Sequence, residues 1–144
     1  MKNLLQRVLS PVVAISLVFA FTAFNANASD EPPIVIDIDV APNVLNIQSN
    51  STVVTVHTNI PYSAVDSSSV LLNGVLIDWW KSDNQGNFVA KFVSDEVKEL
   101  VDDGMLETGE IFLTLTLIGN TTAGDQFNGT QTILVINNLP KGKK

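Results

Sequence analysis

The sequence contains no cysteine and a single histidine, and aromatic side chains make up only 7% of its 144 residues. Without cysteine the chain can form no disulfide, no thiolate metal site and no cysteine nucleophile. A lone histidine, His57, cannot supply a zinc site that needs several imidazole ligands, and we expect it to face solvent on a strand. No G-x-S-x-G sequence marks a hydrolase nucleophile either. These absences favour a protein without a cofactor and without enzymatic activity.

No acidic side chain occurs near the start of the sequence, which has the organisation of a secretory signal peptide. Lys2 and Arg7 make the start positive, and a long apolar run follows. Ala26-Asn27-Ala28 then supplies the small residues that a signal peptidase reads, so we expect residues 1–28 to be removed before Ser29. The alternative is a retained membrane anchor. Cleavage predicts a secreted, periplasmic or cell-surface protein, and the signal resembles bacterial ones.

Basic side chains are scarce in the remainder of the sequence. Removal of 28 of the 144 residues leaves 116, with six basic and 15 acidic side chains and a formal charge of −9. Three of the six lysines lie in the tail 139–144, which we expect to be flexible. A chain without a basic patch is poorly suited to the phosphate backbone, so we expect no nucleic-acid partner. No apolar segment follows the last lysines, so we expect no membrane anchor once the signal is cleaved.

Short apolar runs separated by polar turns predict one all-β domain over residues 34–138, after a flexible lead-in over 29–33. The expected strands cover residues 34–40, 44–48, 52–58, 70–72, 75–77, 87–92, 111–118 and 127–136. We expect a loop over 59–69 and one short helix over 94–103, with Ser94 as its N-cap and Gly104 at its end. Seven or eight strands of this kind form an antiparallel two-layer sandwich with one short connecting helix.

Asn73-Gly74 predicts a tight hairpin, because both residues tolerate the positive φ of a type I′ turn. The turn pairs Leu72 with Val75, and the strand alternation then places Trp79 on the core face and Trp80 on the opposite face. A bulge just before Trp79 would exchange the two rings.

Trp80 is the centre of the candidate ligand-binding site. The expected alternation leaves it outward beside Leu71 and Leu76. An exposed tryptophan with apolar neighbours can stack on a sugar ring or anchor a protein partner. In the alternative, a loop or the helix folds over the ring.

Asp37 and Asp39 form a weaker candidate, for a metal ion. They share one face of the first expected strand, about 7 Å apart, and could hold a cation if a third oxygen donor joined them. In the alternative they form an ordinary solvated strand face.

Several stretches together resemble a domain that recurs in bacterial and archaeal secreted and surface proteins. They are Val65-Asp66 with Val70-x-Leu72-Asn73-Gly74, the run Asp83-Asn84-x-Gly86-Asn87-Phe88, Leu115-Thr116-Leu117-x-Gly119, and Gly124-x-x-Phe127-x-Gly129. The resemblance implies an Ig-like sandwich with no established activity. Some relatives have a denser run of aspartates and glycines near Asp83, similar to a calcium loop, which this chain has in thinner form.

These observations predict a secreted, non-enzymatic module with a structural or adhesive role, whose partner is a protein or a glycan outside the cell. The alternative is a carbohydrate-binding module that uses Trp80. A small glycosidase would need two carboxylates in a deep cleft, and a sandwich of this size has little room for one.

Overall fold

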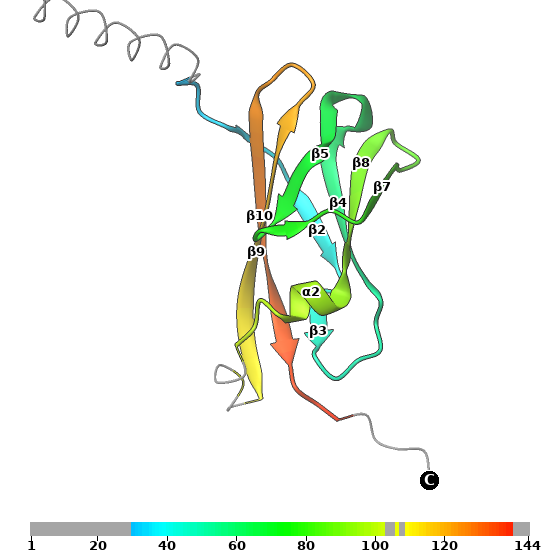
Figure 1. Cartoon of the computed structure of the whole chain (residues 1–144), viewed down its shortest axis with the longest axis vertical. Coiled ribbons are helices and arrows are strands. Elements are labelled where there is room, and N and C mark those ends of the chain that lie inside the picture. The colour runs from blue at the N-terminus through cyan, green and yellow to red at the C-terminus, as the bar shows by residue number, and fades with distance from the viewer. Residues whose placement is uncertain (1–29, 103–105, 107–108, 140–144) are drawn as a thin grey trace, which may run out of the picture. The chain divides into compact units, whose positions relative to one another are not determined.

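The computed structural model describes residues 30–102, 106 and 109–139 (Figure 1). The chain divides into two compact units, and the second, Pro32–Lys144, contains every described strand. The expected signal peptide, its cleavage site at Ala28 and Ser29, Gly104 and all but the first residue of the basic tail lie outside the described residues. No helix within the described ranges is long and apolar enough to cross a membrane.

Ten strand segments and two short helices lie within the described residues of the second unit. The strands are β1 (Ile34–Val35), β2 (Ile38–Ala41), β3 (Val44–Asn46), β4 (Val53–Pro61), β5 (Val65–Leu72), β6 (Val75–Leu76), β7 (Trp79–Ser82), β8 (Asn87–Val93), β9 (Glu110–Thr121) and β10 (Gln126–Ile136). A 3-10 turn, η3 (Tyr62–Ala64), links β4 to β5, and the helix α2 (Ser94–Lys98) follows β8.

The strands form two sheets, as a β-sandwich requires. Sheet A has the order β1-β10-β9-β5-β6, with β3 also paired to β10, and sheet B has the order β2-β4-β8-β7 (Figure 1). The expected all-β sandwich is confirmed at this level. Sheet A is mixed rather than antiparallel, because β1 and β3 both pair with β10 in parallel.

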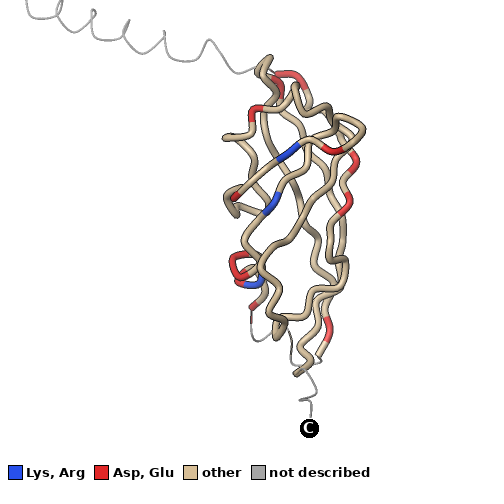
Figure 2. Tube along the Cα trace, turned by 90° about the vertical axis from the view of Figure 1, so that its right-hand side faces the viewer, with Lys and Arg blue, Asp and Glu red and all other residues tan. Residues whose placement is uncertain are grey.

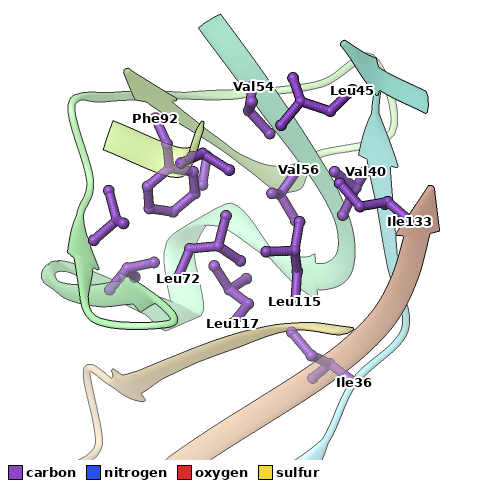
Figure 3. Packing of buried hydrophobic residues seen from close by; sticks show 14 of the residues in the cluster. Ile36, Val40, Leu45, Val54, Val56, Leu72, Phe92, Leu115, Leu117 and Ile133 are labelled. Atoms are coloured by element: carbon purple, nitrogen blue, oxygen red, sulfur yellow. The ribbon is translucent and has the colours of Figure 1, made fainter. Parts of the chain in front are cut away.

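The core lies between the two sheets (Figure 3) and takes alternate residues from β4, β8, β9 and β10, whereas β5 contributes Val65, Val70 and Leu72 around its register shift. Its largest fully buried side chains include Phe88, Phe92, Phe127, Leu45, Leu72, Leu115 and Leu117. The strand alternation predicted all of these except Phe127 as inward residues. Each such side chain contributes about 1.5–3 kcal/mol through the apolar surface that it removes from water.

The segment 34–40 is not one strand, contrary to the sequence expectation. The chain leaves sheet A after β1 and enters sheet B at β2, and the Ile36 amide donates a hydrogen bond to the Asn128 carbonyl at the crossing. Gly129 makes the crossing possible, since a Cβ there would lie 2.8 Å from the Ile36 carbonyl oxygen. Four alternating apolar residues suggested a single strand, but only Ile36 and Val40 of the four are buried, and Ile34 in β1 is 45% exposed.

The Asn73-Gly74 hairpin is confirmed. Both residues have positive φ, 45° and 85°, and Leu72 pairs with Val75. The Asn73 side chain also accepts a hydrogen bond from the Thr116 amide at 2.7 Å and donates one to the Thr114 carbonyl at 3.1 Å. The Asn73 side chain therefore continues the hydrogen bonding to β9 beyond the end of β5. It can do so because an amide side chain has both a donor and an acceptor.

The expected loop over residues 59–69 is wrong. Strand β4 extends to Pro61 and β5 begins at Val65, so only η3 connects them. The serine-rich composition concealed β5, whose register against β9 shifts between Asp66 and Leu71. Small polar side chains fit such an irregularity because they can bond locally, as the Ser68 hydroxyl does with the Asp66 carboxylate at 2.7 Å.

The helix is shorter than expected and has a different cap. It covers Ser94–Lys98, with turn hydrogen bonds that continue to Val101. Val93 occupies the N-cap position, and the Ser94 hydroxyl is buried without a hydrogen-bond partner in the described part of the chain. The expected apolar stripe does pack inward, since Val97 and Val101 are buried. The Lys98 ammonium donates to the Ser49 carbonyl at 2.7 Å and so ties α2 to the turn before β4.

Candidate functional site

A hollow of about 190 Å³ lies where β5 of sheet A faces the edge of sheet B. Six residues line it: Tyr62, Ser63, Val65, Ser67, Trp80 and Phe88. We call this hollow the aromatic groove, because three of its six residues carry aromatic rings.

Trp80 reaches the aromatic groove because of its position in the β7–β8 pairing. It lies directly opposite Ala90, a fully buried core residue, so both side chains are on the inner side of sheet B. Strand β7 is the edge of this sheet, and the ring therefore remains 36% exposed rather than enclosed.

Tyr62 forms the opposite part of the groove. Its ring stacks on Phe88 with centroids 6.2 Å apart, and its amide donates to the Gly86 carbonyl at 2.9 Å. The β4–β8 register shifts between His57 and Pro61, and the buried Thr58 hydroxyl bonds the Phe88 carbonyl there at 2.6 Å. After this register shift, β4 ends beside the groove, and Tyr62, which directly follows β4, is 40% exposed there.

The lining of the aromatic groove carries no carboxylate, imidazole or amine. Its polar groups are the Tyr62 phenol and the hydroxyls of Ser63 and Ser67, and neither serine side chain makes a hydrogen bond within the described residues. Aromatic faces and uncharged hydroxyls can bind a neutral ligand by stacking and hydrogen bonding.

Trp79 is not a core residue, contrary to the sequence expectation. It is 52% exposed and lies opposite Lys91, on the outer side of sheet B. The expectation assumed that one strand continued from Val75 through Trp79. Instead the chain leaves sheet A after Leu76 and joins sheet B at Trp79, and this crossing exchanges the two rings as a bulge would have done.

The structure does not bring Trp80 together with Leu71 and Leu76. The two leucines pair with each other in sheet A, where Leu76 is 69% exposed, whereas Trp80 belongs to sheet B. The predicted platform of three residues is therefore divided between two sheets. Trp80 has Tyr62 as its aromatic neighbour across the groove instead.

The two aspartates proposed for a metal ion are both exposed. Asp37 lies in the crossing between β1 and β2, and its carboxylate accepts a hydrogen bond from the Asn59 amide group at 3.1 Å. Asp39 lies in β2 opposite His57, which is also exposed. Among the described residues, no three His, Cys, Asp or Glu side chains lie close enough together to hold a metal ion.

Sequence reasoning missed Tyr62, Ser63 and Ser67, because all three fall in the segment that it took for a loop. The sequence did contain one indication of a strand here, since the apolar residues Val65 and Val70 stand on either side of the polar run. Both are buried in the structure. An aromatic residue directly after Pro61 in a polar segment was a further indication of a packed connection.

Comparison of the chain with protein-family models, curated proteins and solved structures found no match in any of the three.

Proposed function

We propose that this protein is an exported, non-enzymatic binding module with an Ig-like arrangement of strands. Support for the arrangement comes from the strand orders. An Ig domain places its first, second, fifth and fourth strands in one sheet, and β2-β4-β8-β7 has this order when β1 and β3 are counted with the first strand and β6 with the third. The remaining strands, β5, β9 and β10, are neighbours in sheet A, as the third, sixth and seventh strands of an Ig domain are.

The binding role rests on one observation, which is the aromatic groove with its uncharged lining. A module that presents Tyr62 and Trp80 to solvent suits an adhesive role towards a protein or a glycan outside the cytoplasm. The lining lacks the pair of carboxylates that glycoside hydrolysis needs, and this favours binding over chemistry.

A neutral glycan is the ligand that the aromatic groove suits best. A sugar ring offers an apolar C–H face to Trp80 or Tyr62 and hydroxyls to the free side chains of Ser63 and Ser67. The groove is small, so we expect it to hold a single ring or a chain end, with weak affinity per site.

Pull-down on insoluble neutral polysaccharides (cellulose, chitin and xylan) tests this assignment with the cleaved chain. Trp80→Ala and Tyr62→Ala should each lower the bound fraction at least about tenfold, the effect of losing roughly 1.4 kcal/mol of stacking. Trp79→Ala is the matched control, because its ring lies on the other side of the same strand. If Trp79→Ala weakens binding as much as Trp80→Ala does, or if no glycan is retained, the groove is not a glycan site.

Export is tested separately from binding. Mass spectrometry of the protein recovered outside the cytoplasm should give Ser29 as the first residue, because cleavage follows Ala28. Folded exported protein that still begins at Met1 would contradict this part of the proposal.

A further inference from the structure

The outer face of sheet B gathers positive charge in a chain that is otherwise acidic. The described part of the chain contains three lysines, and two of them, Lys81 and Lys91, lie on the neighbouring strands β7 and β8. Figure 2 shows them as two blue segments close together, whereas the third blue segment belongs to α2. With 15 acidic residues in the sequence, two adjacent lysines are an unusual local excess.

The strand register places the Trp79 ring with both lysines. Trp79 lies opposite Lys91, and Lys81 is two residues further along β7, so all three side chains share the outer face. The Lys91 ammonium lies 4.9 Å from the centre of the Trp79 ring. Lys81 is the diagonal neighbour of Lys91, which puts their backbones about 7–8 Å apart. We call these three residues the basic patch.

Val89 shows that the side chains around the basic patch are packed. It lies on the outer face between Lys81 and His57, outside the core cluster between the sheets, and yet its exposure is 0%. Its neighbours on that face must therefore cover it. Side chains held against a buried valine lose less freedom on binding a ligand than free surface lysines would.

The two ammonium groups have no carboxylate partner in the described part of the chain, whereas Lys98 forms an ion pair with Asp95. Asp78 and Asp83 flank β7, whereas Asp39 lies in β2, which is two strands from β8 and three from β7. The Asp83 carboxylate accepts hydrogen bonds from the amides of Gln85 and Asn87 at 2.8 and 2.9 Å, so it is directed to its own turn.

We propose that the basic patch binds a carboxylated polysaccharide, one built from uronic acid units. Each uronate ring combines an apolar face, which can stack on Trp79, with one carboxylate, which can pair with Lys91 or Lys81. A DNA duplex carries one charge per about 1.7 Å of its axis, which is a much higher charge density than one carboxylate per sugar ring and more than two lysines can neutralise. The site is distinct from the aromatic groove, because Trp79 and Trp80 point to opposite sides of β7.

Tryptophan fluorescence tests the proposal directly with polygalacturonate as the probe and neutral galactan as its uncharged counterpart. The sequence has two tryptophans, so Trp80→Phe leaves Trp79 as the only one and gives a signal from the basic patch alone. In this background we expect polygalacturonate to change the Trp79 emission and galactan to leave it unchanged. The change should weaken steeply between low salt and about 1 M salt, where the screening length falls to about 3 Å.

Charge-removing variants in the same background assign the effect to residues. Lys81→Gln with Lys91→Gln should lower the polygalacturonate affinity at least tenfold, and Lys98→Gln, which lies on α2, should leave it unchanged. Thermal melts check that each variant is folded. Equal losses in the Lys98→Gln variant, an equal response to galactan, or no response to polygalacturonate would each overturn the proposal. So would salt-dependent self-association that Lys81→Gln with Lys91→Gln abolishes, since the acidic partner would then be a second copy of the chain.

Discussion

The β9–β10 pair and the β7–β8 pair differ in how many strands flank them and in how far their residues are exposed. β9 and β10 pair without interruption from Gln126 opposite Asn120 to Ile136 opposite Glu110, and both have further neighbours in sheet A (Figure 1). β7 has only β8 as a neighbour, and all four of its residues are exposed. A central strand must bury one face in full, whereas an edge strand leaves both faces partly accessible.

Three of the four described phenylalanines follow the difference between central and edge strands. Phe127 of β10 and Phe88 and Phe92 of the central strand β8 are nearly or fully buried, whereas both tryptophans of the chain lie in the edge strand β7. Phe112 of β9 is the exception, with 80% exposure. We therefore expect the central strands to contribute most of the stability, and the edge strand to present the groups that are able to meet a ligand. Three predictions test this division.

The largest effect is expected in β9. Leu117→Ala should lower the free energy of unfolding by about 2–5 kcal/mol, because the leucine is fully buried and its removal leaves a cavity. Ile118→Ala is the matched control, since the next residue points outward with 43% exposure and should cost about 1 kcal/mol or less. Urea unfolding of both variants measures the difference, and similar losses would show that β9 does not bury one face as described.

An intermediate effect is expected in β7. Trp80→Ala should destabilise the domain by about 1–2 kcal/mol, because Trp80 is 36% exposed and the rest of its surface is buried. Trp79→Ala should cost less, about 1 kcal/mol at most, since half of its ring is exposed and its contact with Lys91 is a surface one. Thermal melts rank the two variants. A loss for Trp79→Ala near the 3–5 kcal/mol of a core aromatic residue would restore the original assignment of the rings.

The smallest effect is expected in the turn between β7 and β8. The backbone hydrogen bond from Asn87 holds the pKa of the Asp83 carboxyl below its usual range. A lowered pKa means that the charged carboxylate stabilises the turn above the ordinary range of an aspartate, and that this contribution is lost as the pH falls through the lowered pKa.

Amide NMR of Asn87 can follow this loss. We expect its resonance to titrate below the usual range of an aspartate, while the β9–β10 amides do not respond. Asp83→Asn keeps an oxygen acceptor and removes the charge, so the titration should disappear with the turn retained. An unchanged titration in Asp83→Asn would assign the pH dependence to another group.

Local chemistry predicted the hairpin turn and the strand faces correctly, but not the N-cap of α2, which is Val93 rather than Ser94. Asn73-Gly74 specified its turn because few residues accept positive φ. The alternations around Leu115 and around Phe88 identified the buried faces of β9 and β8. The predicted grouping of Trp80 with Leu71 and Leu76 is not present, because Trp80 lies in sheet B with Tyr62 as its neighbour across the groove.

The sequence by itself determined the all-β class, the positions of most strands and the side of each strand that is apolar. These properties follow from a period of two residues, which operates within a single strand. Only the tertiary structure decided which sheet each segment joins, at the crossings after Val35 and after Leu76. The physical reason is that sheet membership depends on backbone pairing with distant strands, and the alternation of side chains starts anew with each pairing. The position of each tryptophan ring was therefore decided by the partner strand β8 and not by the residues next to it in the sequence.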